Sequence, residues 1–94
     1  MAMHNPSHPG ELLRDDVLPA LGLTVSVLAK HLHYSESDLS AVLHGRSAIN
    51  AELAVCLELA GVGSARHWLA QQLAYDLWQA QQRKRPAISR LDVM

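Results

Sequence analysis

The sequence predicts an all-helical domain of five helices, of which the last is the longest. Apolar residues recur at intervals of three and four along most of the chain, as they do on the buried face of a helix. Residues that cap helix N-termini alternate with glycines that can end helices, so each helix has a defined start and stop. No segment alternates apolar and polar residues for long enough to predict a strand.

The first helix is predicted over residues 11–18, with Pro9 in its first turn and Gly22 closing it. Proline suits the first turn because the amide hydrogen that it lacks would have no partner there. The apolar row of this helix is Leu13, Val17 and Leu21.

Two short helices follow, joined by a three-residue link, His33 to Ser35. Thr24 caps the first of the pair, and Ser35 with Asp38 has the pattern of a capping box at the start of the second. Gly45 ends the second by tolerating a left-handed backbone. The rows predicted to face the core are Val25, Leu28, Ala29 and Leu32, then Leu39, Val42 and Leu43.

Asn50 caps a fourth helix that ends at residues 61–63, and Ser64 starts the fifth. The fifth helix is predicted to run to about Arg85, because Pro86 disfavours helical geometry in the residue before it. The fourth helix directs Leu53, Cys56, Leu57 and Ala60 inward. The fifth has two neighbouring apolar rows, a wider arc than one core contact needs. These rows are Leu69, Leu73, Leu77 and Ala80, and then Trp68, Tyr75 and Trp78.

The composition fits one small globular domain with an aliphatic core. The chain has 94 residues, of which 49% are hydrophobic and 18% charged, and it contains no Phe. A single cysteine, Cys56, excludes an internal disulfide and a zinc cluster built on thiolates. No targeting segment is apparent, and no segment approaches the roughly 18 apolar residues of a membrane span. We therefore expect a cytoplasmic protein that does not enter membranes.

The pair of short helices is the informative feature of the chain. A link of three residues leaves room only for a sharp crossing, which is the geometry of a helix-turn-helix. Ala29 supplies the small side chain that close packing of the second helix requires, and Leu39 and Val42 close the small core. The same spacing occurs in ordinary helical bundles. On spacing alone, DNA binding and a purely structural bundle are both open.

Several motifs follow one another in a specific order. They are His8-Pro9-Gly10-Glu11-Leu12-Leu13-Arg14, Leu21-Gly22-Leu23-Thr24, Leu28-Ala29, Leu39-Ser40, His44-Gly45-Arg46-Ser47-Ala48-Ile49, Trp68-Leu69 and Tyr75-Asp76-Leu77-Trp78. Their order and spacing over residues 4–83 resemble the HigA and VapI type of antitoxin, within the Xre class of helix-turn-helix proteins. The resemblance implies a lambda-repressor-like DNA-binding domain that forms a homodimer, represses its own operon at a palindromic operator and neutralises a RelE-like ribonuclease toxin.

The expected organisation has three parts. Residues 1–8 form an N-terminal arm, residues 9–85 the helix-turn-helix domain with its motif at 24–44, and residues 86–94 a C-terminal tail.

The third helix is expected to read DNA bases, because the stripe opposite its core-facing row would face the major groove. The base-facing residues are Glu36, Ser37, Ser40, Ala41 and His44. The stripe holds none of the Arg, Lys, Asn or Gln side chains that discriminate bases best, which predicts weak readout. Glu36 and Asp38 also have a purely structural interpretation, because the helix dipole stabilises carboxylates in a first turn.

Phosphate contacts need only a positive or hydrogen-bonding group near the DNA backbone. The candidates are Thr24, Ser26, Lys30, Arg46 and Ser47. Arg46 is preferred, because family members carry a Gly-Arg or Gly-Lys step at this place. Tyr75 and Trp78 are candidates for a dimer or toxin surface, since aromatic residues dominate interface energies, whereas Trp68 is assigned to the core.

We expect no metal, no cofactor and no catalytic activity. His31 and His33 point in different directions at a helix end, and no Cys or carboxylate completes a tetrahedral set with them. No residue pair stands out as nucleophile and base, and no glycine-rich phosphate loop follows a strand.

The net charge of −1 conceals an uneven distribution. Residues 1–82 hold four Lys or Arg against eight Asp or Glu, while residues 83–94 hold four against one. This predicts a DNA binder with few phosphate contacts and modest affinity. Two alternatives to an antitoxin repressor are a protein-interaction module of the same fold with weak or lost specific DNA binding, and a stand-alone regulator without a toxin.

Overall fold

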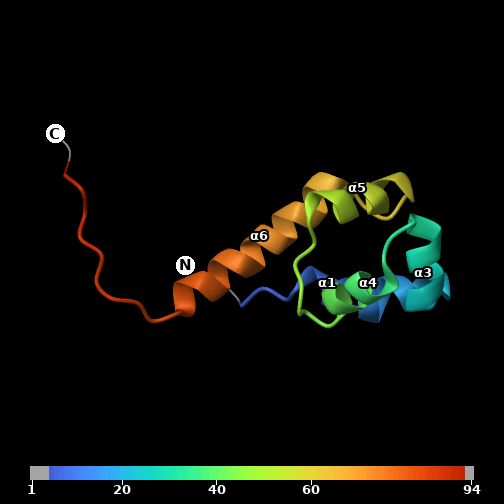
Figure 1. The fold of residues 1–94 in the computed structure, drawn as a ribbon, viewed down its shortest axis with the longest axis horizontal. Coiled ribbons are helices and arrows are strands. Elements are labelled where there is room, and N and C mark those ends of the chain that lie inside the picture. Colours follow the sequence, from blue (N-terminus) through green and yellow to red (C-terminus); the bar gives the residue numbers. More distant parts are fainter. Residues whose placement is uncertain (1–4, 93–94) are drawn as a thin grey trace.

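In the computed structural model, which describes residues 5–92, five helices surround one aliphatic core and no strand occurs in that range (Figure 1). The predicted all-α fold with a long last helix is therefore confirmed. Residues 1–4 of the predicted arm and 93–94 of the predicted tail lie outside the described residues.

The first helix is continuous but changes its winding in the middle. It consists of α1 (Pro9–Leu12), the π-helical turn η1 (Leu13–Val17) and α2 (Leu18–Leu21). The wide turn closes with a hydrogen bond from the Leu18 amide to the Leu13 carbonyl. Pro19 follows directly, and a proline ring inside a regular α-helix would clash with the carbonyl four residues earlier. The π-turn accommodates Pro19, and Gly22 ends the helix in the left-handed conformation.

The helix-turn-helix consists of α3 (Val25–Leu32) and α4 (Glu36–Leu43), which pack against each other. The Thr24 hydroxyl accepts from the Val27 amide at 3.2 Å, and the Ser35 hydroxyl accepts from the Asp38 amide at 3.2 Å. His33 turns the chain with a φ of 55°, and it is the one non-glycine residue with positive φ in the described chain. The predicted three-residue link is confirmed.

The last two helices are α5 (Ala51–Leu59), capped by Asn50, and α6 (Ala65–Gln82), capped by Ser64. The C-terminal half of α6 extends beyond the other helices, and the chain then continues without a helix through residues 83–92 (Figure 1). The helix thus ends three residues before the predicted Arg85. Residues 81–92 are all exposed, so no packing supports another turn before Pro86.

The core is built from leucines of the first four helices and from Trp68 of α6, together with Ala29, Val42, Ile49 and Ala54. The predicted assignment of Trp68 to the core is confirmed. The row of Leu69, Leu73 and Leu77 is largely outside it, because Leu73 and Leu77 are 59% and 48% exposed. Helix α6 instead meets α1 and α5 through the side that holds Trp68 and Gln72.

Candidate nucleic-acid interface

The solvent-facing side of α4 holds the residues predicted to face DNA bases. Leu39, Val42 and Leu43 are fully buried, which turns the opposite side of the helix outward. On that side Glu36, Ser37 and His44 are exposed, and Ser40 and Ala41 are half-buried. All five predicted base-facing side chains are therefore accessible.

Two of these side chains are oriented by local hydrogen bonds. The hydroxyls of Ser37 and Ser35 lie 3.3 Å apart at the start of α4. The Nδ1 atom of His44 lies 2.9 Å from the Ser40 carbonyl oxygen, which can only accept. Nδ1 must therefore donate, and a neutral His44 ring presents Nε2 to solvent as an acceptor. That atom is suited to an amino group on a base edge.

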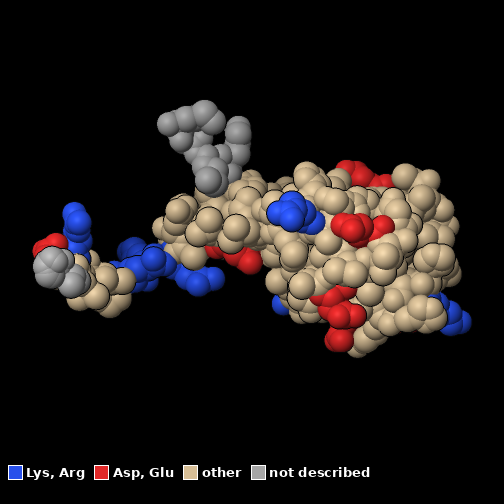
Figure 2. Space-filling model, turned by 90° about the horizontal axis from the view of Figure 1, so that it is seen from above, with Lys and Arg blue, Asp and Glu red and all other residues tan. Residues whose placement is uncertain are grey.

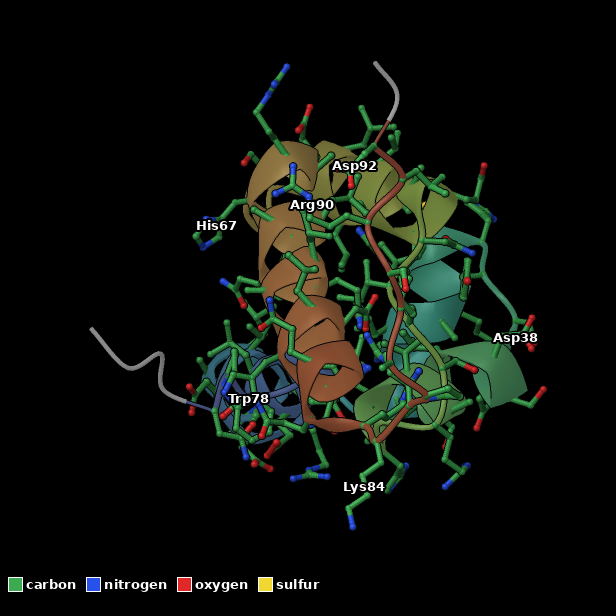
Figure 3. The ribbon with its side chains drawn as sticks, turned by 90° about the vertical axis from the view of Figure 1, so that its left-hand side faces the viewer. Asp38, His67, Trp78, Lys84, Arg90 and Asp92 are labelled. Atoms are coloured by element: carbon green, nitrogen blue, oxygen red, sulfur yellow. The ribbon has the colours of Figure 1, made fainter. Side chains whose placement is uncertain are left out.

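The N-terminal turn of α4 is acidic. Glu36 and Asp38 are exposed there, and Asp38 points away from the helical core (Figure 3). Their carboxylates stabilise the positive end of the helix dipole and repel phosphate groups that approach them. Their position in the first turn of α4 agrees with the structural interpretation, and it favours an approach in which phosphates lie elsewhere along the motif.

The predicted phosphate-contacting residues flank α4 in the chain. Thr24, Ser26 and Lys30 are exposed on α3, and Arg46 and Ser47 are exposed after α4. The Thr24 oxygen accepts from a backbone amide, so its hydroxyl hydrogen is available to a phosphate. The backbone amides of Arg46 and Ser47 both donate to the Ala41 carbonyl, at 2.8 and 3.2 Å. Only the side chains of these two residues are available for contacts with DNA.

The segment between α4 and α5, residues 44–50, is called the contact loop below. Its Ile49 amide donates to Oε1 of Gln72 at 2.8 Å, and its Ser47 backbone interacts with the His8 imidazole. His8 accepts from the Gly10 amide through Nδ1 at 2.9 Å and meets the Tyr75 ring edge-on, with centroids 4.9 Å apart. Burial lowers the pKa of His8 despite the nearby carboxylates of Asp76 and Glu11.

Sequence reasoning missed three residues that organise this region: His8, Gln72 and Arg14. Gln72 follows buried Trp68 by four residues on α6, and that spacing is a signal that its side chain points inward. Arg14 pairs with Asp15 at 2.8 Å and donates to the Leu43 carbonyl at 3.3 Å, at the end of α4. Asp15 raises the pKa of Arg14, so the guanidinium keeps its charge at this contact.

The two residues predicted for a dimer or toxin surface lie on α6. Tyr75 and Trp78 are both half-buried, and Tyr75 packs on His8. Trp78 and Asp38 lie on opposite sides of the molecule when it is viewed along α6 (Figure 3). A partner at Trp78 therefore approaches a different side from the one that the start of α4 faces.

Charge is distributed as the sequence indicated. Figure 2 shows acidic side chains spread over the helical body, while Lys and Arg gather along the extended segment after α6. That segment leaves the molecule at the end opposite α3 (Figure 1). Arg83, Lys84 and Arg85 therefore do not join Lys30 on one face of the same protomer.

No helix in residues 5–92 is long and apolar enough to cross a membrane. Within the same residues, no three His, Cys, Asp or Glu side chains form a group that could hold a metal ion.

Comparison with known proteins gives close relatives. Virulence-associated protein I of Dichelobacter nodosus is 42% identical over 77 residues, which are 82% of this chain and 71% of that protein. The solved structure of antitoxin GraA matches with a TM-score of 0.80 at 30% identity, over 85% of this chain and 86% of that one. The Pseudomonas aeruginosa antitoxin HigA, solved with the higBA promoter, matches with a TM-score of 0.76 at 32% identity, over 80% and 82% of the two chains. The sequence matches no protein-family model.

Proposed function

The chain belongs to the HigA and VapI type of Xre-class helix-turn-helix proteins, and from this premise we propose that it is an antitoxin that represses its own operon. The observation that supports this most is the exposed stripe of α4, presented by a helix-turn-helix whose structural relatives include an antitoxin solved with its promoter. The proposed site of action is the cytoplasm, and no enzymatic step is involved.

DNA recognition in this proposal uses a symmetric dimer. Each protomer places its α4 in the major groove, and the two helices lie about 34 Å apart along a palindromic operator. Side chains of α3 and of the contact loop hold the DNA backbone on either side of each groove. The base-facing residues Ser37, Ser40 and His44 offer hydroxyls and a ring nitrogen, which bond to several base edges rather than to a single base.

The affinity of this complex is expected to be modest. Lys30 and Arg46 are the two cations among the proposed phosphate-contacting residues, and the first turn of α4 is acidic. Because each neutralised phosphate adds to the salt dependence, the affinity of the dimer should fall only gently as salt rises.

Footprinting of the DNA upstream of the gene tests the DNA-binding part. The expected pattern is two protected half-sites whose centres are about 10 base pairs apart. Protection that is uniform along the fragment, or absent, would contradict specific operator binding.

The proposal for the protein partner is a small ribonuclease toxin of the RelE-like type. The relationship to antitoxins supports it, and so does the surface of α6, where Tyr75 and Trp78 are accessible and Leu73 and Leu77 are exposed. Neutralisation would be steric, by covering or distorting the RNA-binding surface of the toxin. Aromatic side chains with an apolar surround are typical anchors of such interfaces.

Co-expression with a ribonuclease-like reading frame beside the gene tests this partner. The two proteins should co-purify, with the ribonuclease inactive, and Trp78→Ala should weaken the complex. Val55→Ala, at an exposed apolar position on α5, is the matched control and should leave it intact. A ribonuclease that stays active and unbound beside the folded chain would contradict the partner proposal.

One observation favours a second candidate, an interaction module with weak or lost specific DNA binding. None of the five base-facing residues is Arg, Lys, Asn or Gln, the side chains that discriminate bases best. This candidate predicts toxin binding together with equal affinity for operator and scrambled DNA. A stand-alone regulator predicts the reverse, operator preference without a toxin.

A further inference from the structure

Two buried polar side chains lie against the same short loop. His8 and Gln72 are 5% and 4% exposed, and they are the buried polar or charged residues among those that the structure describes. They lie far apart in the sequence. Gln72 hydrogen-bonds to the backbone of the contact loop, and the His8 ring lies beside Gly45 of the same loop. Burying a polar group is unfavourable unless its hydrogen bonds are made, so Gln72 depends on its partner in the loop.

Gln72 fixes the second half of the contact loop. Its Oε1 accepts from the Ile49 amide at 2.8 Å, and its Nε2 donates to Oδ1 of Asp76 at 2.9 Å. Asp76 thereby selects which end of the Gln72 amide faces the loop. Ile49 itself is 2% exposed, so the hydrogen bond lies out of water, where it is strongest.

The His8 ring lies beside the first half of the same loop, where its Cγ is 4.0 Å from the position that a Cβ on Gly45 would take. Its Nδ1 accepts from the Gly10 amide, so a neutral ring has its hydrogen on Nε2. Tyr75 packs edge-on against this ring and holds its plane.

We propose that Gln72 is a positioning residue for DNA binding: it holds the contact loop so that Arg46 and Ser47 meet the phosphate backbone without further ordering. This inference rests on the proposed function, because it assigns the loop to DNA. Residues 44–48 are exposed. The amides of Gly45, Arg46 and Ser47 tie their backbone to the end of α4, while the bond between Ile49 and Gln72 ties the loop to α6. Ordering such a segment only on binding reduces affinity, and preorganisation removes that loss.

Two matched substitutions on α6 test whether Gln72 affects DNA binding. Gln72→Met keeps the side-chain volume and removes both hydrogen bonds. We expect it to lower affinity for the upstream DNA about tenfold under conditions where the protein stays folded, because the phosphate contact of Arg46 is lost. Gln71→Met, the same change at the adjacent half-buried position of α6, should leave the affinity unchanged.

A double-mutant cycle with Arg46→Ala is the decisive readout. If Gln72 acts through Arg46, adding Arg46→Ala to Gln72→Met should reduce affinity by little more than either change alone. In urea unfolding, the changes that the two substitutions cause in the free energy of unfolding should be additive. Additive losses in DNA affinity would overturn the proposal.

A paired exchange restores the hydrogen bonds if Gln72→Met proves unstable. In Gln72→Glu with Asp76→Asn, the new carboxylate accepts from the Ile49 amide and from the new amide at position 76, and the net charge is unchanged. This pair should regain most of the affinity that Gln72→Glu alone loses. Affinity that stays as low as in the single variant would overturn the proposal.

Hydrogen exchange of the free protein makes the test independent of DNA. Gln72→Met should speed exchange of the Arg46 and Ser47 amides, which donate to Ala41 rather than to Gln72. Unchanged exchange at both amides would contradict positioning even if DNA affinity falls. A wild-type protein that binds no duplex DNA refutes the proposed function instead, and in that case the exchange result still decides whether Gln72 orders the loop.

Discussion

Arg46 is the residue on which DNA affinity should depend most. Its guanidinium is exposed, while its backbone amide is occupied by Ala41, so all of its contact with DNA comes from the side chain. A phosphate contact has no sequence preference. The residues proposed to face bases should differ in this respect, because base contacts act on the choice between sequences.

Arg46→Ala should weaken binding to operator and scrambled DNA by the same factor. The loss of one cation per protomer should also lower the slope of log affinity against log salt by about one for each phosphate contact removed. Fluorescence anisotropy at several salt concentrations measures both quantities. A variant that lost affinity for the operator alone would contradict the assignment of Arg46 to phosphate.

Ser40→Ala should change the preference among DNA sequences rather than the overall affinity. Ser40 is half-buried on the base-facing stripe, and removing its hydroxyl should change the ranking of operator variants with little effect on the salt slope. Competition binding with a set of single-base operator substitutions gives the ranking. An unchanged ranking together with a uniform loss of affinity would place Ser40 outside the base-reading surface.

His8 should make the protein less stable as the pH falls. Burial lowers its pKa in the folded chain, so the unfolded chain takes up the proton first, and stability is full above the ordinary histidine pKa of about 6.5. In the folded chain a proton on Nδ1 would remove the acceptor for the Gly10 amide. Urea midpoints measured from about pH 7.5 to about pH 5 should fall more steeply for the wild type than for His8→Asn, which retains an acceptor. Equal slopes would contradict this role.

At the scale of the elements, the starts of the helices were predictable because each depends on local chemistry. Thr24, Ser35, Asn50 and Ser64 each accept a hydrogen bond from the amide three residues later, as the sequence pattern predicts. Such contacts involve only neighbouring residues. The buried side of α4 was predictable for a similar reason, because three apolar residues fix the orientation of the short helix and expose the opposite stripe.

Features that depend on distant packing were not predictable in this way. The end of α6 at Gln82 follows from which residues find partners in the folded molecule. The leucine row of α6 resembles a core face, but Trp68 and Gln72 occupy the core instead. His8 and Gln72 gave little sign of their role, because a single polar residue in a sequence does not show what it will contact.

The turn of the helix-turn-helix retains strain that a substitution should relieve. His33 adopts a φ of 55°, a conformation that disfavours residues with a Cβ. His33→Gly should raise the free energy of unfolding by up to about 1 kcal/mol, partly offset by the greater freedom of glycine in the unfolded chain. His31→Gly, inside α3, is the matched control and should lower it by roughly 0.5–1 kcal/mol. Urea unfolding measures the free energy of unfolding of both variants. A loss of stability in His33→Gly would contradict the claim that the backbone is strained at His33.

On the scale of the whole molecule, the distribution of charge matters more than its sum. The acidic residues lie on the helical body, and the basic segment after α6 leaves at the end opposite α3. Screening limits the reach of exposed charges to about 10 Å at moderate salt. In the proposed complex each protomer therefore offers DNA the two cations Lys30 and Arg46, and a dimer offers twice as many.

The two proposed interfaces lie on different sides of the molecule. The stripe of α4 is the surface proposed to face DNA, while Trp78 on α6 lies on the side opposite Asp38 (Figure 3). The two are nevertheless linked through α6, because Gln72 hydrogen-bonds to the contact loop and Tyr75 packs on His8. The proposed function therefore places a toxin and an operator on different sides of one domain.

The most direct test of specific repression is the ratio of two affinities. Fluorescence anisotropy at fixed salt compares the palindromic DNA upstream of the gene with a scrambled duplex of the same composition. The proposed function predicts that the affinity for the upstream sequence is at least about tenfold higher than for the scrambled duplex. This ratio is small for a specific DNA-binding protein, because the base-facing stripe discriminates weakly between bases. A ratio near one would contradict it and would leave the domain as a protein-interaction module.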